Sequence, residues 1–274
     1  MNGLEKYEKI LKQSCLFRQK DAEELQELGR LLGGKIQDYG KGQQLLHEGD
    51  TIGQLGIVLE GEVRIVRIDM DGNERLFQKL IPSYMLGADI VCTPSRQSPY
   101  SAYCSQDAKV WFFDWMPGHK KWEEELERRL MEFIANENVR KFYRIDILST
   151  KSVRRRVLKY LRIQCRKTGS NTVEIPYSRE ELANYLCVNR SVLSDELGRM
   201  QEEGIITFRK NRFTLCKGGR DARLTESLPP LPFGTVGAGV SSYNKQVRKQ
   251  TVKIYKKQGR NTAVSVKMAE KNHI

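Results

Sequence analysis

The chain has 274 residues, of which 39% are hydrophobic and 30% are charged, and its formal net charge is +13. This length holds roughly two domains with buried cores. No apolar run reaches the ~18 residues that cross a membrane, and the charged first residues do not form a secretory signal. We therefore expect a cytoplasmic protein with no membrane partner.

The sequence has no recognisable pattern for metal binding or catalysis. Six cysteines are scattered without a Cys-x-x-Cys spacing, and His47, His119 and His273 are far apart. Zinc sites need closely spaced ligands of these types. A phosphate-binding loop and a Ser/His/Asp set are also missing from the sequence. We expect no metal, no cofactor and no catalytic residue, and we interpret the chain as not an enzyme.

The first part of the chain, residues 1–119, is expected to form one domain in which helices precede many strands. Met1–Leu32 is predicted to be helical, with a second helix starting at Asp21. Over residues 36–115, short β-favouring runs alternate with Gly, Asp and Pro, which is typical of a β-barrel or sandwich. Asp71-Gly72 is the strongest hairpin signal among these turns.

Residues 120–148 are predicted to form a long helix with an imperfect apolar stripe. The stripe consists of Leu126, Leu130, Phe133, Ile134, Phe142 and Ile145. A long helix with one apolar side needs a partner. Two interpretations stay open: the helix packs on the β-rich domain, or it pairs with its copy in a second chain as a dimerisation helix, which we favour.

Residues 149–217 carry the most informative pattern in the chain. Ser178 and Glu181 form a capping box that predicts the start of one helix, and Asn189 is expected to cap a second helix after a three-residue break. Gly204 is expected to end that second helix. Its apolar side is predicted to hold Leu193, Leu197 and Met200.

Two short runs, residues 205–208 and 213–215, follow and are expected to pair as a hairpin. Two short helices, a tight turn and a hairpin together predict a winged helix-turn-helix, the arrangement that a reader of the DNA major groove requires. The helix before them, Ser149–Arg166, carries an outward basic face. This face consists of Arg154, Arg155, Arg156 and Lys159. We interpret it either as a phosphate contact or as a solvated face.

The last segment, residues 218–274, has eleven basic and three acidic residues and no periodic apolar pattern. This composition predicts a disordered basic tail. The tail either adds non-specific affinity for DNA or has no function.

The order of these parts resembles the CRP/FNR family of bacterial transcription regulators over roughly residues 10–216. The shared motifs are Glu48-Gly49-Asp50, Leu59-Glu60-Gly61-Glu62-Val63, Asp71-Gly72, Ser178–Ala183, Asn189–Ser194 and Glu203–Ile206. The resemblance implies an α+β fold. That fold consists of an N-terminal double-stranded β-helix, or β-roll, sensor similar to a cyclic-nucleotide-binding domain, a long dimerisation helix and a C-terminal winged helix-turn-helix.

The resemblance also implies which residues contact double-stranded DNA. Base contacts fall on Asn189, Arg190, Ser191, Ser194 and Asp195, and phosphate contacts on Ser178, Arg179, Arg199, Lys210 and Arg212. Arg190 is the best base reader, because a guanidinium holds guanine O6 and N7 together. Two positions depart from the family pattern: Asp195 stands where many members have an arginine, and Cys187 replaces the usual glycine of the turn.

The family's cyclic-nucleotide pocket uses a Gly-Glu pair for the ribose and an Arg-Ser pair for the phosphate. The corresponding effector-pocket residues here are Gly87 with Ala88 and Tyr100 with Ser101. Both the ribose-binding carboxylate and the phosphate-binding arginine are therefore missing. A buried phosphate without a cation is costly, so we expect no binding of cAMP.

The function expected from this resemblance is sequence-specific regulation of transcription by a homodimer on a pseudo-palindromic operator. The expected partners are double-stranded DNA, RNA polymerase and an unknown small-molecule effector. Two alternatives stay open: a regulator that needs no effector, and a protein-interaction module with a degenerate sensor.

Overall fold

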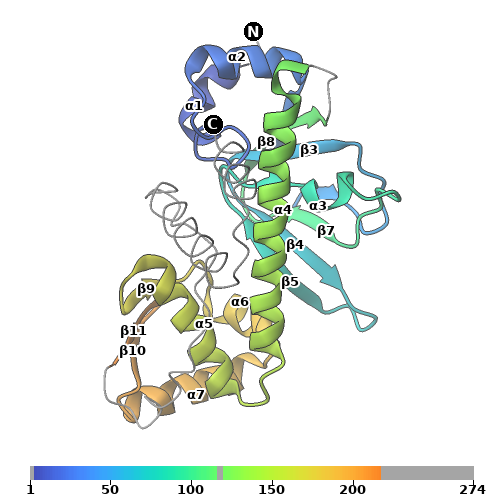
Figure 1. Cartoon of the computed structure of the whole chain (residues 1–274). Helices are drawn as coiled ribbons and strands as arrows, with labels where there is room; N and C mark the ends of the chain where they lie inside the picture. Colours follow the sequence, from blue (N-terminus) through green and yellow to red (C-terminus); the bar gives the residue numbers. More distant parts are fainter. Residues whose placement is uncertain (1–2, 116–119, 217–274) are drawn as a thin grey trace, which may run out of the picture. The chain divides into compact units, whose positions relative to one another are not determined.

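The computed structural model describes residues 3–115 and 120–216 (Figure 1). They lie within one compact unit, Met1–Leu228. None of the helices in this part of the chain is long and apolar enough to cross a membrane. The expected disordered tail, residues 218–274, lies outside the described residues.

The N-terminal region is less helical than the sequence predicts. It contains the 3-10 helix η1 (Leu4–Tyr7), the short helix α1 (Glu8–Leu11) and the longer helix α2 (Ala22–Leu31). The prediction of helices over Met1–Leu32 is confirmed only in part, because residues 12–21 are not helical, and Gln19, with a φ of 67°, lies among them. The predicted second start is confirmed, because Asp21 caps α2 through the backbone N–H of Glu24 at 2.8 Å.

The β-rich part consists of two four-stranded antiparallel sheets. The first has the order β1 (Lys35–Tyr39), β8 (Ala108–Asp114), β3 (Gln54–Glu60), β6 (Met85–Leu86), and the second β2 (Gln44–Leu46), β7 (Ser101–Cys104), β4 (Val63–Ile68), β5 (Glu74–Leu80). Asp71-Gly72 lies in the hairpin between β4 and β5, as predicted. Neither β1 nor β7 carries a clear alternation of apolar and polar residues, so the sequence indicates them only as part of the β-rich stretch.

Two buried clusters hold this domain together. Val58, Val63 and Val110 belong to a core formed by strands of both sheets. A second core joins the N-terminal helices, the first sheet and α4 (Lys120–Leu148), with Trp111 among its fully buried side chains. The short helix α3 (Ala88–Val91) follows β6. The predicted fold class, a β-roll followed by a winged helix-turn-helix, is confirmed.

The long helix α4 runs along the β-rich domain (Figure 1). Leu126 and Leu130 are buried in the core, whereas Met131, Phe142 and Ile145 are 71%, 64% and 63% exposed. The predicted apolar stripe therefore divides: its first residues pack on the sensor, and its last ones face outward. Polar contacts with the β-rich domain continue along α4 as far as Arg144, which donates to the carbonyls of Leu76 and Phe77.

The remaining elements form the winged helix-turn-helix. They are α5 (Val153–Thr168), β9 (Thr172–Glu174), α6 (Arg179–Tyr185), α7 (Arg190–Glu202), β10 (Ile206–Arg209) and β11 (Arg212–Leu215). The strands pair in the order β10-β11-β9, so the predicted hairpin gains a third strand. Gly204 follows α7 with a φ of 68°, a conformation that glycine adopts without steric cost.

Candidate DNA interface and sensor cavity

The first helix of the motif, α6, begins as the sequence predicts. The backbone N–H of Glu181 donates to the Ser178 hydroxyl at 3.2 Å, and the Glu181 carboxylate accepts from the Ser178 N–H at 2.8 Å. Both interactions satisfy donors that a helix start leaves unpaired. The capping box fixes where α6 starts and therefore where the following turn lies.

The turn between α6 and α7 contains the expected departure. Cys187 has a φ of 53°, the left-handed conformation that favours glycine, and its side chain is exposed. Asn189 is the N-cap of α7, as predicted, but its side chain makes no capping hydrogen bond. Its side chain therefore does not contribute the expected capping interaction.

The second helix, α7, has one buried and one exposed side. Leu193, Leu197 and Met200 are fully buried. The exposed side includes all five predicted base readers: Asn189, Arg190, Ser191, Ser194 and Asp195. It also includes Val192, which is 45% exposed and which the sequence-based site omitted. In the sequence, Val192 is only one residue of the shared motif Asn189–Ser194, and nothing there distinguishes it from a buried apolar residue. The structure shows that Val192 faces outward while Leu193 is buried.

The predicted phosphate contacts have different surroundings. Arg179 is half-buried, and its guanidinium lies over the rings of Phe208 and Phe213 at 4.7 and 5.4 Å. It also donates to the carbonyl of Lys210 at 3.4 Å, and burial lowers its pKa. Arg179 therefore connects the start of α6 to the hairpin, and the Ser178 hydroxyl is engaged in the capping box.

The other three predicted phosphate contacts are exposed. Lys210 lies at the tip of the hairpin with a φ of 55°, and Arg212 begins β11. Arg199 is 66% exposed and approaches Glu196 only at 3.7 Å. Among the described residues the only ion pair of these three cations is that of Arg199 with Glu196, so each of them can reach a phosphate without breaking a close pair.

The basic face of α5 is largely engaged within the protein, so its interpretation as a solvated face was wrong for most of its members. Arg154 donates to Glu203 through two bonds of 2.7 Å and to Glu196 at 2.6 Å. These bonds raise the pKa of Arg154. Arg156 donates to carbonyls of the turn, including Leu186 at 3.0 Å. The helix α5 therefore holds α7 and the turn in place.

The four predicted effector-pocket residues are also engaged internally. Gly87 has a φ of 83° and precedes α3, and Ala88 is fully buried. The Tyr100 hydroxyl donates to Asp89 at 3.1 Å, and the Ser101 hydroxyl accepts from the backbone N–H of Glu48 at 3.0 Å. Of the four, Ala88 and Tyr100 line the large cavity described next, whereas Gly87 and Ser101 do not.

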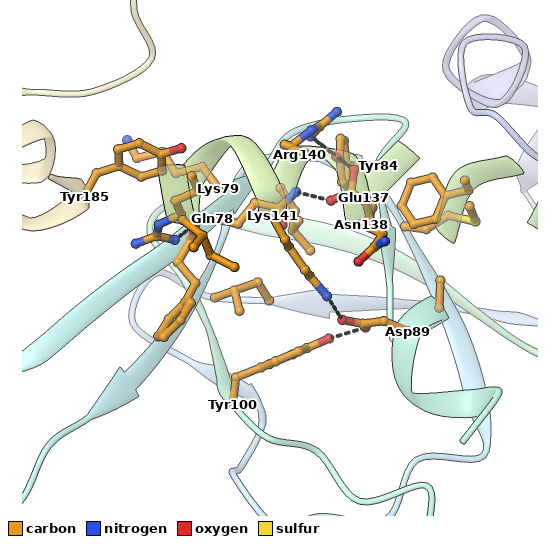
Figure 2. A pocket seen from close by; sticks show the side chains of 18 of the residues that line it. Gln78, Lys79, Tyr84, Asp89, Tyr100, Glu137, Asn138, Arg140, Lys141 and Tyr185 are labelled. Atoms are coloured by element: carbon orange, nitrogen blue, oxygen red, sulfur yellow. Dashed lines mark hydrogen bonds and ion pairs between the residues drawn. The ribbon is translucent and has the colours of Figure 1, made fainter. Parts of the chain in front are cut away.

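The cavity has a volume of about 1050 Å³ and is lined by β4, β5, β6, α3, α4, α5 and α6. Its most polar group of side chains lies where α4 faces the β-rich domain (Figure 2). Tyr84 and Gln78 donate to the Glu137 carboxylate, and Lys141 donates to Asp89 at 3.0 Å. The sequence offered no signal for this group, because its members come from three separate elements.

A β-roll, a long helix and a winged helix-turn-helix with an exposed, partly basic second helix define a DNA-binding transcription regulator. Residues 36–116 match the family described as cyclic nucleotide-binding domain, and residues 155–218 match the Crp-like helix-turn-helix domain. The chain belongs to the CRP/FNR family.

Individual relatives agree with this assignment. The chain is 26% identical over 203 residues to the nitrogen fixation regulation protein FixK of Bradyrhizobium diazoefficiens, covering 72% of this chain and 83% of that one. It is 24% identical over 207 residues to the transcriptional activator protein FnrL of Cereibacter sphaeroides, covering 71% and 81%. The solved structure of the c-di-GMP responsive regulator CLP from Xanthomonas campestris shares the fold, with a TM-score of 0.55, 15% identity and coverage of 72% and 100%.

Proposed function

We propose that this regulator acts as a homodimer that binds a pseudo-palindromic operator through α7 and responds to a small molecule other than cAMP. The exposed side of α7 carries the proposal. We further propose that the regulator contacts RNA polymerase. We also propose that it acts in the cytoplasm.

The exposed side of α7 suits base reading because it offers different chemistries on one face. Arg190 supplies a guanidinium for guanine, Ser191 and Ser194 supply hydroxyls, and Asp195 supplies an acceptor for cytosine N4. Arg199, Lys210 and Arg212 flank this face as exposed cations and supply phosphate contacts. We assign Arg179 and Ser178 to positioning α6 rather than to direct phosphate contacts, because both are engaged within the motif.

The exposed side of α4 supports the dimer. Met131, Asn138 and Ile145 are exposed and recur every seven residues, and Ile134, Lys141 and Leu148 follow each of them by three. This is the a/d spacing of a two-stranded coiled coil, in which a single asparagine at an a position fixes the register. Two copies joined along this seam would present two copies of α7 to a symmetric DNA site.

The hydrogen bonds around Tyr100 support an effector other than cAMP. Where the family's pocket has an arginine for the phosphate, Tyr100 donates to Asp89, and Lys141 pairs with the same carboxylate. A phosphate bound there would lie near the Asp89 carboxylate and be repelled by it, because the Lys141 ammonium already pairs with that carboxylate. Calorimetric titration with cAMP should therefore show no binding, and micromolar affinity would overturn this part of the proposal.

Selection of preferred sites from a random DNA pool tests the main proposal. The wild-type protein should select two related half-sites about one helical turn apart. Arg190→Ala should lose the preference for one base in each half-site while keeping most of its non-specific affinity. DNA reading by α7 would be contradicted if the wild-type protein selected no sequence, or if Arg190→Ala selected the same sequence as the wild type. Either result would favour the alternative of a protein-interaction module.

Sedimentation measurements test the dimer separately. Ile145→Glu places a charge on the exposed seam of α4 without touching the sensor core, so it should convert the dimer to a monomer. Arg128→Gln changes an exposed residue of the same helix at neither an a nor a d position and should leave the dimer intact. A wild-type protein that sediments as a monomer contradicts the proposal.

A further inference from the structure

One residue of the exposed α4 seam does not suit a helix pair. The seam consists of Met131, Ile134, Asn138, Lys141, Ile145 and Leu148, and Lys141 is its only charged member. Two helices that join about a two-fold axis bring each seam residue close to its own copy. The two Lys141 ammonium groups would then face each other in a contact that excludes part of the water, where like charges repel and a lysine costs stability.

The Lys141 side chain reaches from α4 to the sensor of the same chain (Figure 2). Its ammonium donates to the Asp89 carboxylate at 3.0 Å, and the two side chains are 57% and 33% exposed. Ion pairs with this much exposure add little to the stability of a fold, because water screens them and ordering the side chains costs entropy. The pair therefore matters little for the single chain, and its larger effect falls on the seam beside it.

The carboxylate of this pair has a fixed position. Asp89 lies in the first turn of α3, between Ala88 and Ile90, which are both buried and belong to the two separate cores of the sensor. The Tyr100 hydroxyl donates to its other carboxylate oxygen at 3.1 Å. Packing and a second hydrogen bond thus hold Asp89, and the flexible Lys141 side chain adapts to it.

We propose that Asp89 enables the two α4 helices to pair by holding the Lys141 ammonium off the seam. This inference rests on the homodimer proposed above. The ion pair neutralises the charge that would otherwise face its own copy, and the aliphatic stem of Lys141 remains to pack along the seam. Asp89 is therefore a positioning residue for the dimer although it belongs to the sensor, and the strength of the dimer depends on where α3 holds it.

Sedimentation equilibrium of the full chain, without DNA, tests the proposal. Asp89→Asn frees the Lys141 ammonium and should weaken dimerisation about tenfold, the effect of one repelled pair of charges. Lys141→Met removes the charge and keeps an apolar side chain, so it should dimerise at least as tightly as wild type. The double variant Asp89→Asn with Lys141→Met should match Lys141→Met alone, because the two residues act through one interaction.

A matched control is available on the first sheet of the sensor. Asp38→Asn breaks another exposed lysine–aspartate pair, that of Asp38 with Lys109, and should leave the dimer unchanged. Salt then separates charge repulsion from a structural loss. Raising the salt from about 0.05 to about 0.5 M screens exposed charges, so it should strengthen the Asp89→Asn dimer more than it strengthens the double variant. A disrupted α3 would instead weaken both variants alike at either salt concentration.

The outcomes distinguish this inference from the homodimer itself. A dimeric wild type whose Asp89→Asn variant dimerises with unchanged strength would overturn the role of Asp89 and leave the homodimer standing. A defect of Asp89→Asn that Lys141→Met does not repair would overturn it in the same way. A monomeric wild type would refute the homodimer, and this inference with it.

Discussion

The side-chain oxygen of Asn184 accepts a hydrogen bond from the backbone N–H of Leu76 at 2.6 Å. The amide nitrogen of the same side chain donates to the carbonyl of Glu74. One asparagine of α6 therefore pairs with the backbone of β5 as a neighbouring strand would. Lys79 strengthens the same contact, because it donates to the carbonyl of Pro176 at 3.0 Å and pairs with Glu181 at 2.7 Å.

Replacing Asn184 with alanine should lower the free energy of unfolding by about 1–3 kcal/mol, because it leaves a buried backbone N–H and a carbonyl without partners. Denaturation in urea measures the change. Asn171→Ala, in an exposed turn, is the matched control and should change stability by less than about 0.5 kcal/mol. Equal effects of the two variants would show that the contact between Asn184 and β5 contributes nothing.

Val192 should read a thymine methyl group. It is the apolar member of the exposed side of α7, and a methyl-to-methyl contact in the major groove distinguishes thymine from the other bases. Replacing the contacted thymine with uracil should weaken the wild-type protein about fourfold, the value of one buried methyl group. Val192→Ala should bind both DNAs alike, and a uracil scan of the operator by gel shift reveals the position. The prediction is contradicted if no thymine-to-uracil replacement in the operator weakens binding of the wild-type protein.

Arg154 should affect DNA affinity without affecting sequence preference. Its bonds to Glu196 and Glu203 hold α7 on α5, so Arg154→Met should weaken binding to all sequences about tenfold by loosening the reading helix. Arg155→Met, at an exposed position of the same helix, removes the same charge and serves as the control. Gel shifts on the operator and on a scrambled duplex separate the two effects. If Arg155→Met weakens binding as much as Arg154→Met, the loss reflects charge rather than positioning.

The stabilising contribution of Glu181 should be lost in acid. Burial raises the pKa of its carboxyl, but the bonds from Lys79 and the Ser178 N–H outweigh burial, so the pKa in the folded protein lies below 4.5. A depressed carboxyl pKa stabilises the fold above the unfolded pKa, and this stability is lost as the pH falls through the folded value. The difference in unfolding free energy between wild type and Glu181→Gln should be constant at neutral pH and shrink below pH 4.5. A pH-independent difference would mean that the ion pair does not contribute.

Local chemistry explains what could be predicted from the sequence. The capping box at Ser178, the hairpin at Asp71-Gly72 and the glycine after α7 depend on residues next to one another, so their geometry follows from their spacing. The exposed side of α7 follows from helical periodicity in the same way. These features include most of the DNA-reading face.

The contacts that the sequence did not reveal are long-range ones. Asn184 and Leu76 are 108 positions apart, and nothing in either neighbourhood identifies the other. The cavity is assembled from seven elements, and the pairing of Lys141 with Asp89 spans 52 positions. Arg154 was read as a surface charge because its partners on α7 are distant in sequence.

The uninterrupted course of α4 over Lys120–Leu148 sets a rule for exchanging parts between members of this family. Each residue added to or removed from a helix turns everything beyond it by about 100°. A chimera that joins the sensor of one regulator to the DNA-binding region of another within α4 therefore keeps the rotational phase only if the joint preserves the residue count. Removing or adding seven residues nearly restores the phase, whereas removing two would turn the exposed seam away from its partner.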